Sequence, residues 1–198
     1  MQRKDNMHRV WSLSEAPTPA YIIHEGMLDM NLATIDRVRR EAEVEIIVAL
    51  KANATWHLFP RLKQHSDGAT ASSLSEARLV MEYMGIKAHT YAPVYTEEEI
   101  DAILEASSHI TFNSLAQYER YGERAKERGV SCGLRVNPEY STVETDLYNP
   151  AMPESRLGVC AVDLEVLPEG IEGLHFHALC ESRPTDLEAT LRSFEERF

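Results

Sequence analysis

The chain has 198 residues, of which 43% are hydrophobic and 26% are charged, as in an ordinary soluble globular protein with a sizeable core. Its formal net charge of −12 disfavours nucleic acid and anionic membranes as partners, because both are themselves negatively charged. Cys132, Cys160 and Cys180 form no C-x-x-C pair, and no stretch approaches the roughly 18 apolar residues of a membrane span. These features predict a cytoplasmic protein with free thiols.

The N-terminal part of the chain is polar and irregular. We expect residues 1–19 to form an N-terminal extension and residues 20–198 to form one domain. At the start of that domain, residues 20–24 predict a short strand. Residues 29–43 then predict a helix, because their apolar side chains recur at helical spacing.

A continuous apolar run at 46–50 is followed by Lys51. The run is too short for a helix and rich in β-branched residues, so it predicts a strand buried on both faces of a parallel sheet. An ammonium at the end of such a strand is unfavourable unless it reaches solvent or has a chemical task. The spacing alone favours a lysine that extends into solvent, and the alternative is a catalytic amine freed for covalent chemistry by partial burial.

Beyond Lys51, predicted helices and strands alternate. Helices are predicted at 56–65, 73–84, 96–106, 114–128 and 185–198, and strands at 68–72, 88–92, 109–112, 132–136 and 173–177. The alternation predicts an α/β fold with right-handed crossovers around a parallel sheet. The units recur roughly every 20–22 residues, which is typical of a TIM-type (β/α)8 barrel, although an open doubly wound sheet is an alternative.

Three local patterns add detail to this outline. The residues 73–76 have the form of a capping box at the start of a helix, with Glu76 as its acid, and glutamates at 97–99 suit the first turn of another helix. The stretch 137–156 is a long loop with three prolines, and loops of this length are often functional. No glycine-rich phosphate-binding motif of the usual nucleotide-binding kinds occurs, so nucleotide binding loses support.

Seven segments together carry a resemblance to a known family. In order they are Ala49-Leu50-Lys51-Ala52, Thr70-Ala71-Ser72-Ser73-Leu74-Ser75-Glu76-Ala77, Phe112-Asn113-Ser114-Leu115, Arg135-Val136-Asn137-Pro138-Glu139, Val143-Glu144-Thr145-Asp146-Leu147-Tyr148, Ser155-Arg156-Leu157-Gly158 and His175-Phe176-His177-Ala178-Leu179-Cys180-Glu181. From about Pro17 onward, the sequence resembles the carboxynorspermidine decarboxylases. These are pyridoxal 5′-phosphate (PLP) enzymes of the alanine racemase and ornithine decarboxylase barrel class.

The resemblance implies roles for four side chains. It makes Lys51 the catalytic residue that bonds covalently to the cofactor, in place of the solvent-reaching lysine that spacing favours. It implies that His177 stacks on the pyridine ring, where a structural histidine is the alternative. It also implies that Arg135 lies beside the cofactor, where a surface guanidinium is the alternative. Glu76 is expected to bind cofactor as well, although its capping position already has a complete structural explanation.

Other residues near these motifs remain open. His175, His177 and Cys180 would suggest zinc, but no further ligand has suitable spacing, so no metal site is predicted. Thr70 stands where ornithine decarboxylases carry an aspartate, so details of those enzymes do not transfer directly. Arg156 either serves the site from the long loop or only anchors that loop.

The resemblance implies decarboxylation of carboxynorspermidine to norspermidine and of carboxyspermidine to spermidine, by a homodimer that uses PLP as its electron sink. An acidic protein suits a cationic polyamine through Coulombic attraction. The alternatives are another enzyme of the barrel class, namely a diaminopimelate decarboxylase or an amino-acid racemase, and a non-catalytic PLP-binding protein.

The number of predicted strands indicates whether the barrel is complete. About six barrel strands are predicted from Lys51 to His177, whereas a closed barrel of this class has eight. The resemblance implies that the glycine-rich phosphate site, the acid facing the pyridine nitrogen and a C-terminal β-domain lie outside these residues. We therefore expect an N-terminal fragment with an incomplete barrel that is inactive alone.

Overall fold

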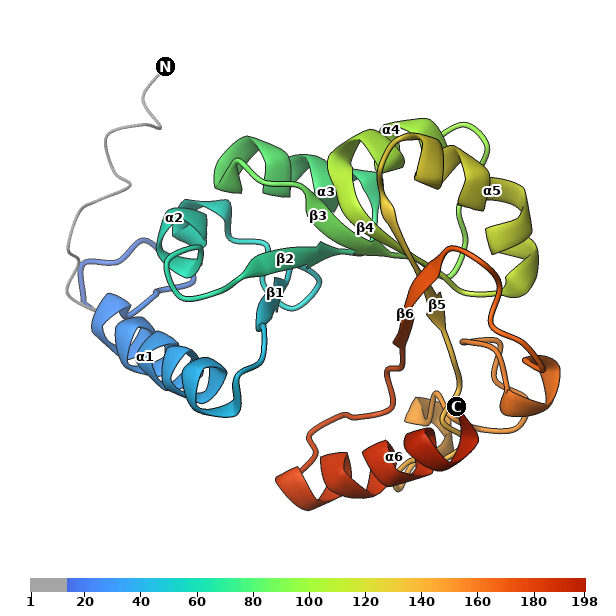
Figure 1. Ribbon diagram of the computed structural model, residues 1–198. Coiled ribbons are helices and arrows are strands. Elements are labelled where there is room, and N and C mark those ends of the chain that lie inside the picture. The colour runs from blue at the N-terminus through green and yellow to red at the C-terminus, as the bar shows by residue number, and fades with distance from the viewer. Residues whose placement is uncertain (1–13) are drawn as a thin grey trace. The chain divides into compact units, whose positions relative to one another are not determined.

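The computed structural model describes residues 14–198 (Figure 1). Residues 1–13 of the predicted extension lie outside the described residues. The chain divides into two compact units, Met1–Val44 and Glu45–Phe198. The domain boundary expected after residue 19 stays a prediction.

The first unit contains one long helix, α1 (Glu25–Ala42). The helix begins earlier than the 29–43 segment predicts, because the imidazole of His24 accepts a hydrogen bond from the Met27 amide and so caps its first turn. The predicted strand at 20–24 is wrong, since these residues precede the cap without pairing to any strand.

The second unit is built on a single sheet of six parallel strands (Figure 1). The strands are β1 (Ile47–Ala49), β2 (Gly68–Ala71), β3 (Ala88–Tyr91), β4 (Ser107–Phe112), β5 (Ser131–Arg135) and β6 (Ile171–His175). Each strand pairs with the next one along the chain, in the order β1-β2-β3-β4-β5-β6. This order is that of a barrel, because a doubly wound sheet reverses its strand order at a switch point. The six predicted strands are therefore confirmed, and the doubly wound alternative is wrong.

The helices follow the strands as the alternation predicts. They are α2 (Phe59–Leu62), α3 (Leu74–Leu79), α4 (Ile100–Ala106), α5 (Leu115–Glu127) and α6 (Pro184–Arg197), with short 3-10 turns at Trp56–Leu58, Asp146–Tyr148 and Ala161–Asp163 and a π-helical turn at Val80–Met84. Figure 1 shows α3, α4 and α5 along one side of the sheet. No helix of the described part of the chain is both long enough and apolar enough to cross a membrane.

Several predicted boundaries and one predicted burial pattern are wrong. The helix α4 begins at Ile100 instead of residue 96, and the strand β6 ends at His175 instead of residue 177. All three residues of β1 are only half-buried, so this strand is not enclosed on both faces within the chain. Leu50, immediately after β1, is by contrast buried.

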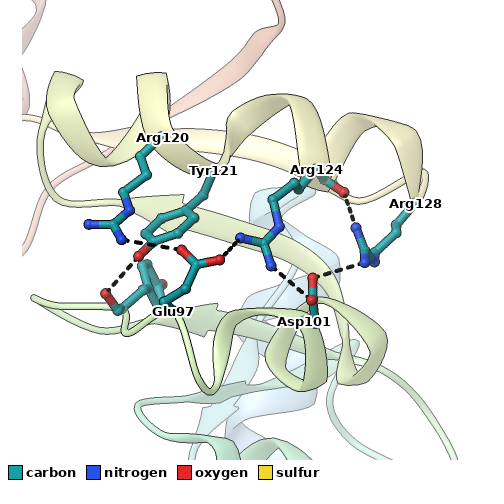
Figure 2. A network of polar contacts seen from close by, with 7 residues as sticks. Glu97, Asp101, Arg120, Tyr121, Arg124 and Arg128 are labelled. Carbon is teal, nitrogen blue, oxygen red and sulfur yellow. Dashed lines mark hydrogen bonds and ion pairs between the residues drawn. The ribbon is translucent and has the colours of Figure 1, made fainter.

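Figure 2 shows the ion pairs made by the residues just before and within the first turn of α4. Glu97 does not cap the helix; it forms ion pairs with Arg120 and Arg124 of α5. Asp101, in the first turn of α4, pairs with Arg124 and with Arg128, each at 2.8 Å. The carboxylates thus link α5 to the start of α4 and to the segment before it, although exposed ion pairs of this kind contribute little to stability.

The main core lies between the sheet and the helices α4 and α5. Phe112 is fully buried there and packs edge-on against Tyr95 and Tyr118, with ring centroids 6.0 and 5.6 Å apart. Because successive residues of a strand point to opposite faces, the neighbours of such core residues lie on the other face of the sheet. We call this the inner face. It carries, among others, Thr70, His89, Tyr91, His109 and Arg135.

Candidate active site

Arg135 is the centre of a polar cluster where the parallel strands end. It is the last residue of β5 and is only 4% exposed. Its Nη1 donates a hydrogen bond to the hydroxyl of Tyr91, and its Nη2 donates one to the carbonyl oxygen of His177 at 3.3 Å. The guanidinium carbon also lies 4.9 Å from the centroid of the Tyr91 ring. A buried charge is thereby stabilised by hydrogen bonds and by a cation–π contact.

Lys51 lies two residues beyond the end of β1. The chain turns there, since the amide of Ala52 bonds to the carbonyl of Ala49 at 3.0 Å. Within residues 14–198 the side chain of Lys51 is exposed, so the partial burial expected for a catalytic amine is not present. Its positive charge contributes to lowering the pKa of both His175 and His177.

His175 is the more deeply placed of the two histidines. Its ring lies edge-on to Tyr91, with 5.1 Å between centroids and 69° between planes. Burial, followed by the charges of Arg135, His177 and Lys51, lowers its pKa to about 4. His175 is therefore a neutral imidazole near neutral pH, and its Nδ1 is buried without a hydrogen-bond partner among the described residues.

His177 follows the end of β6 and is more exposed than His175. Partial desolvation and the charges of Lys51 and Arg135 lower its pKa. Its backbone is fixed by Arg135, whereas its ring is free of aromatic neighbours among the described residues. A neutral imidazole held in this way can present a flat face to a ring-shaped ligand.

Glu76 lies at the start of α3, away from direct contact with Arg135. Ser73 accepts a hydrogen bond from the Glu76 amide at 3.2 Å, as the capping-box pattern predicts. The carboxylate of Glu76, however, accepts from the amide of Ser72 at 2.6 Å instead of from Ser73. Its side chain therefore orders the turn between β2 and α3, and its expected contact with a cofactor stays a prediction.

Sequence reasoning missed Tyr91 and Asn113 as members of this cluster. Tyr91 is the last residue of β3, and Asn113 directly follows β4. The hydroxyl of Tyr91 donates a hydrogen bond to Oδ1 of Asn113 at 2.9 Å. A polar residue at the end of a predicted strand is the signal that singled out Lys51 and Arg135, and it would have found both.

The long loop returns to the sheet beside Arg135. Gly158 has a φ of +94°, and a Cβ at this position would lie 2.7 Å from the backbone of Val136. Only glycine allows this approach, after which Val159 forms a parallel bridge with Val136. Arg156 is exposed, and Asn113 donates a hydrogen bond to its backbone carbonyl. Because this bond does not involve the guanidinium, the choice between a role in the site and a role in anchoring the loop stays a prediction.

The composition of the cluster limits its chemistry. It combines an amine, a buried guanidinium and two imidazoles with lowered pKa, which favours an anionic or electron-rich ligand over a cation. Within residues 14–198, no three His, Cys, Asp or Glu side chains gather closely enough to hold a metal ion.

Comparison with known proteins gives the relatives of this chain. No model of a protein family matches the sequence. The chain is 48% identical over 187 residues to carboxyaminopropylagmatine decarboxylase of Synechocystis sp., covering 94% of this chain and 48% of that protein. It is 41% identical over 182 residues to carboxynorspermidine/carboxyspermidine decarboxylase of Campylobacter jejuni, covering 91% and 47%.

A solved structure agrees with these sequence matches. The crystal structure of carboxynorspermidine decarboxylase from Campylobacter jejuni complexed with norspermidine superposes with a TM-score of 0.84 at 39% identity, covering 92% of this chain and 47% of that one. Over the residues it covers, the chain is similar to the carboxynorspermidine decarboxylases in sequence and in fold. It spans about half the length of the relatives it matches.

A more distant neighbour bears on the fold alone. Diaminopimelate decarboxylase from Helicobacter pylori, complexed with L-lysine, matches with a TM-score of 0.65 at 18% identity. It covers 85% of this chain and 46% of that one. Together with the six consecutive parallel strands, these neighbours confirm the predicted fold, an incomplete barrel of the alanine racemase-like class.

Proposed function

We propose that the complete gene product is a PLP-dependent carboxy-lyase that decarboxylates carboxynorspermidine to norspermidine and carboxyspermidine to spermidine. One observation carries the proposal. The cationic and imidazole cluster of Lys51, Arg135, His175 and His177 stands at the carboxyl ends of strands in a chain that is 39% identical to a norspermidine-bound decarboxylase of the same fold. Active groups of barrel enzymes occupy this edge of the sheet.

The residues present fit PLP, which carries an aldehyde, a phosphate and an aromatic ring. In a chain with a net charge of −12, the cluster concentrates positive charge from Lys51 and Arg135, which suits an anionic cofactor. A primary amine that is exposed and close to two neutral imidazoles suits attachment to an aldehyde. Buried Nδ1 of His175 and Nε of Arg135, which lack partners among the described residues, indicate further polar bonds in the complete site.

Each predicted site residue then receives a role. Lys51 would bind the cofactor covalently and move protons at the substrate carbon. His177 would pack its ring on the cofactor, and Arg135 would hold the backbone of His177 in place. Glu76 would order the turn after β2, close to where the cofactor is expected. When bound, PLP supplies the electron sink for the charge left by loss of carbon dioxide.

A second substrate, carboxyaminopropylagmatine, is a candidate because the relative named for it is 48% identical to this chain. Agmatine ends in a guanidinium where norspermidine and spermidine end in an ammonium. The three substrates therefore share the reacting end and differ at the far end, so the chemistry of the cluster around Arg135 is the same for each.

The test is an assay of carbon dioxide release by the complete gene product, supplied with PLP and, in turn, with each of the three substrates and with diaminopimelate. Release from carboxynorspermidine and carboxyspermidine supports the proposal, and release from carboxyaminopropylagmatine alone favours the second candidate. Release from diaminopimelate alone would favour a diaminopimelate decarboxylase, and inversion at Cα without release would favour an amino-acid racemase. Cofactor binding without turnover would favour a non-catalytic PLP-binding protein. We further propose a homodimer, which light scattering on the same sample would check.

A further inference from the structure

The side chain of Asn113 connects separate parts of the candidate site. It is only 9% exposed. Its Oδ1 accepts hydrogen bonds from the Tyr91 hydroxyl at 2.9 Å and from the amide of Gly158 at 3.1 Å. Its Nδ2 donates to the carbonyl oxygen of Arg156 at 2.8 Å. One buried amide thus joins the end of β3 to the returning end of the long loop.

Tyr91 extends this connection to Arg135. Its hydroxyl accepts from the guanidinium of Arg135 while it donates to Asn113, so the three side chains form one directed chain of hydrogen bonds. The Tyr91 ring also lies below the guanidinium and edge-on to His175. A shift of the Tyr91 side chain would therefore change the contacts of both Arg135 and His175.

The loop return is held to the sheet in two independent ways. The backbone of Val159 pairs with the strand end, since its amide bonds to the carbonyl of Arg135 at 2.9 Å and its carbonyl accepts from Asn137 at 2.8 Å. Arg156 and Gly158, which lie three residues and one residue before Val159, are held by the Asn113 side chain. Backbone pairing alone would fix Val159 and leave the preceding residues unattached to β4.

We propose that Asn113 is a positioning residue of the active site. Through Tyr91 it sets the guanidinium of Arg135, and through its other two hydrogen bonds it holds the segment 156–158 beside that guanidinium. The inference rests on the proposed function, because it assigns a further residue to that site. An amide is required: aspartate has the same shape but offers no donor to the Arg156 carbonyl, and would place a negative charge against it.

The test uses the complete gene product with three variants and a matched control. Asn113→Asp removes the donor, Asn113→Ala removes all three hydrogen bonds, and Tyr91→Phe removes only the hydroxyl. The control is Asn149→Ala. It lies in the same long loop, but its side chain accepts a hydrogen bond only from the nearby Ala151 amide, at 2.9 Å.

The first readout is amide hydrogen exchange at residues 155–158 in the absence of cofactor and substrate. Asn113→Ala should exchange there at least about tenfold faster, because both tertiary bonds of the segment are lost. Asn113→Asp should also exchange faster but by a smaller factor, because its carboxylate still accepts from the Gly158 amide. Tyr91→Phe and Asn149→Ala should leave this exchange within about twofold of the unaltered protein.

The second readout is steady-state decarboxylation. Each of the three variants should lower kcat by at least about tenfold, while KM changes less than about threefold, because the chain of bonds acts on Arg135 at the reacting end. The double variant of Asn113→Ala and Tyr91→Phe should be no slower than Asn113→Ala alone, since both residues act through one chain.

The outcomes separate the two proposals. Unchanged exchange at 155–158 in Asn113→Ala overturns the inference, and so does faster exchange with an unchanged kcat, because the bonds would then hold the loop without serving the site. Additive losses of kcat in the double variant also overturn the coupling through Tyr91. If the unaltered protein decarboxylates none of the three substrates, the proposed function fails, and this role for Asn113 fails with it.

Discussion

The guanidinium of Arg135 lies over the ring of Tyr91 and donates a hydrogen bond to the hydroxyl of the same side chain. The two residues end β5 and β3, which are separated in the sheet by β4. Their contact therefore spans a whole strand and fixes two strand ends relative to each other. Burial raises the pKa of Tyr91 although Arg135 acts in the opposite direction, so the hydroxyl keeps its proton and can donate to Asn113.

The close approach of the loop to β5 predicts a large effect at Gly158. Replacing Gly158 with alanine should lower the free energy of unfolding by about 3 kcal/mol, because the residue has a positive φ and the added Cβ would overlap the backbone of Val136. Urea unfolding of the variant measures the loss.

A matched control for this substitution is Gly129→Ala. Gly129 also has a positive φ, of +67°, but an added Cβ would meet nothing within 4 Å. Its loss should be only about 1 kcal/mol, the cost of the backbone conformation alone. Equal losses at the two glycines would show that the approach to Val136 is not tight in solution.

The depressed pKa of His175 predicts a pH dependence of stability. With a pKa of about 4 in the folded chain and 6.5 as the ordinary value, the unfolded chain binds more protons between these limits. The free energy of unfolding should therefore decrease as the pH falls from about 6.5 to about 4. Thermal unfolding midpoints across this range would record the decrease.

The contribution of His175 can be separated from that of other histidines. The pKa values of His177 and His89 are also lowered, chiefly by desolvation, so both act in the same direction. His175→Phe keeps an aromatic ring against Tyr91 and removes the titration. It should flatten the pH dependence between about 4 and 6.5, and an unchanged slope would assign the effect to the other two histidines.

Much of the fold could be predicted from the sequence because its signals are local. The apolar runs that form β2 to β5 end within one residue of their predicted positions, and Ser73 and Ser114 cap the helices that they precede. The late start of α4 could not be read locally. Glu97 suits a first helical turn, but it pairs with Arg120 and Arg124, which lie more than 20 residues further along the chain.

The site was predictable in part for the same reason. Lys51 and Arg135 stand out because a charge ends an apolar strand. Asn113 follows the predicted strand 109–112, so the same signal marks its position. Its hydrogen bonds could not be predicted, because they depend on the loop return at Arg156 and Gly158, 43 and 45 residues away. The exposure of Lys51 within the described residues is what the spacing alone favours, and the partial burial of a catalytic amine is the alternative that these residues do not show.

A stacking role predicts a moderate effect at His177. Replacing it with alanine should weaken PLP retention by about 1 kcal/mol, or roughly fivefold in Kd, because the ring contact is lost while β6, which ends at His175, keeps its pairing. Equilibrium dialysis measures retention, and circular dichroism checks that the fold persists. His177→Phe, which keeps a flat ring, should retain the cofactor better than the alanine variant; equal retention would return His177 to a structural role.

Lys51 carries the central prediction. In the complete gene product, borohydride reduction in the presence of PLP should attach the cofactor irreversibly to the peptide that contains Lys51, because its amine is exposed and stands at the carboxyl end of β1. Lys51→Ala should abolish this label and lower kcat by at least about a thousandfold, since covalent attachment and proton movement at the substrate carbon are lost together. Lys87→Ala removes an exposed lysine just before β3 and should change neither result. Mass spectrometry of the reduced protein locates the label. A label on another lysine, or substantial turnover by Lys51→Ala, would contradict the assignment of this residue and leave Arg135 and the histidines without their expected partner.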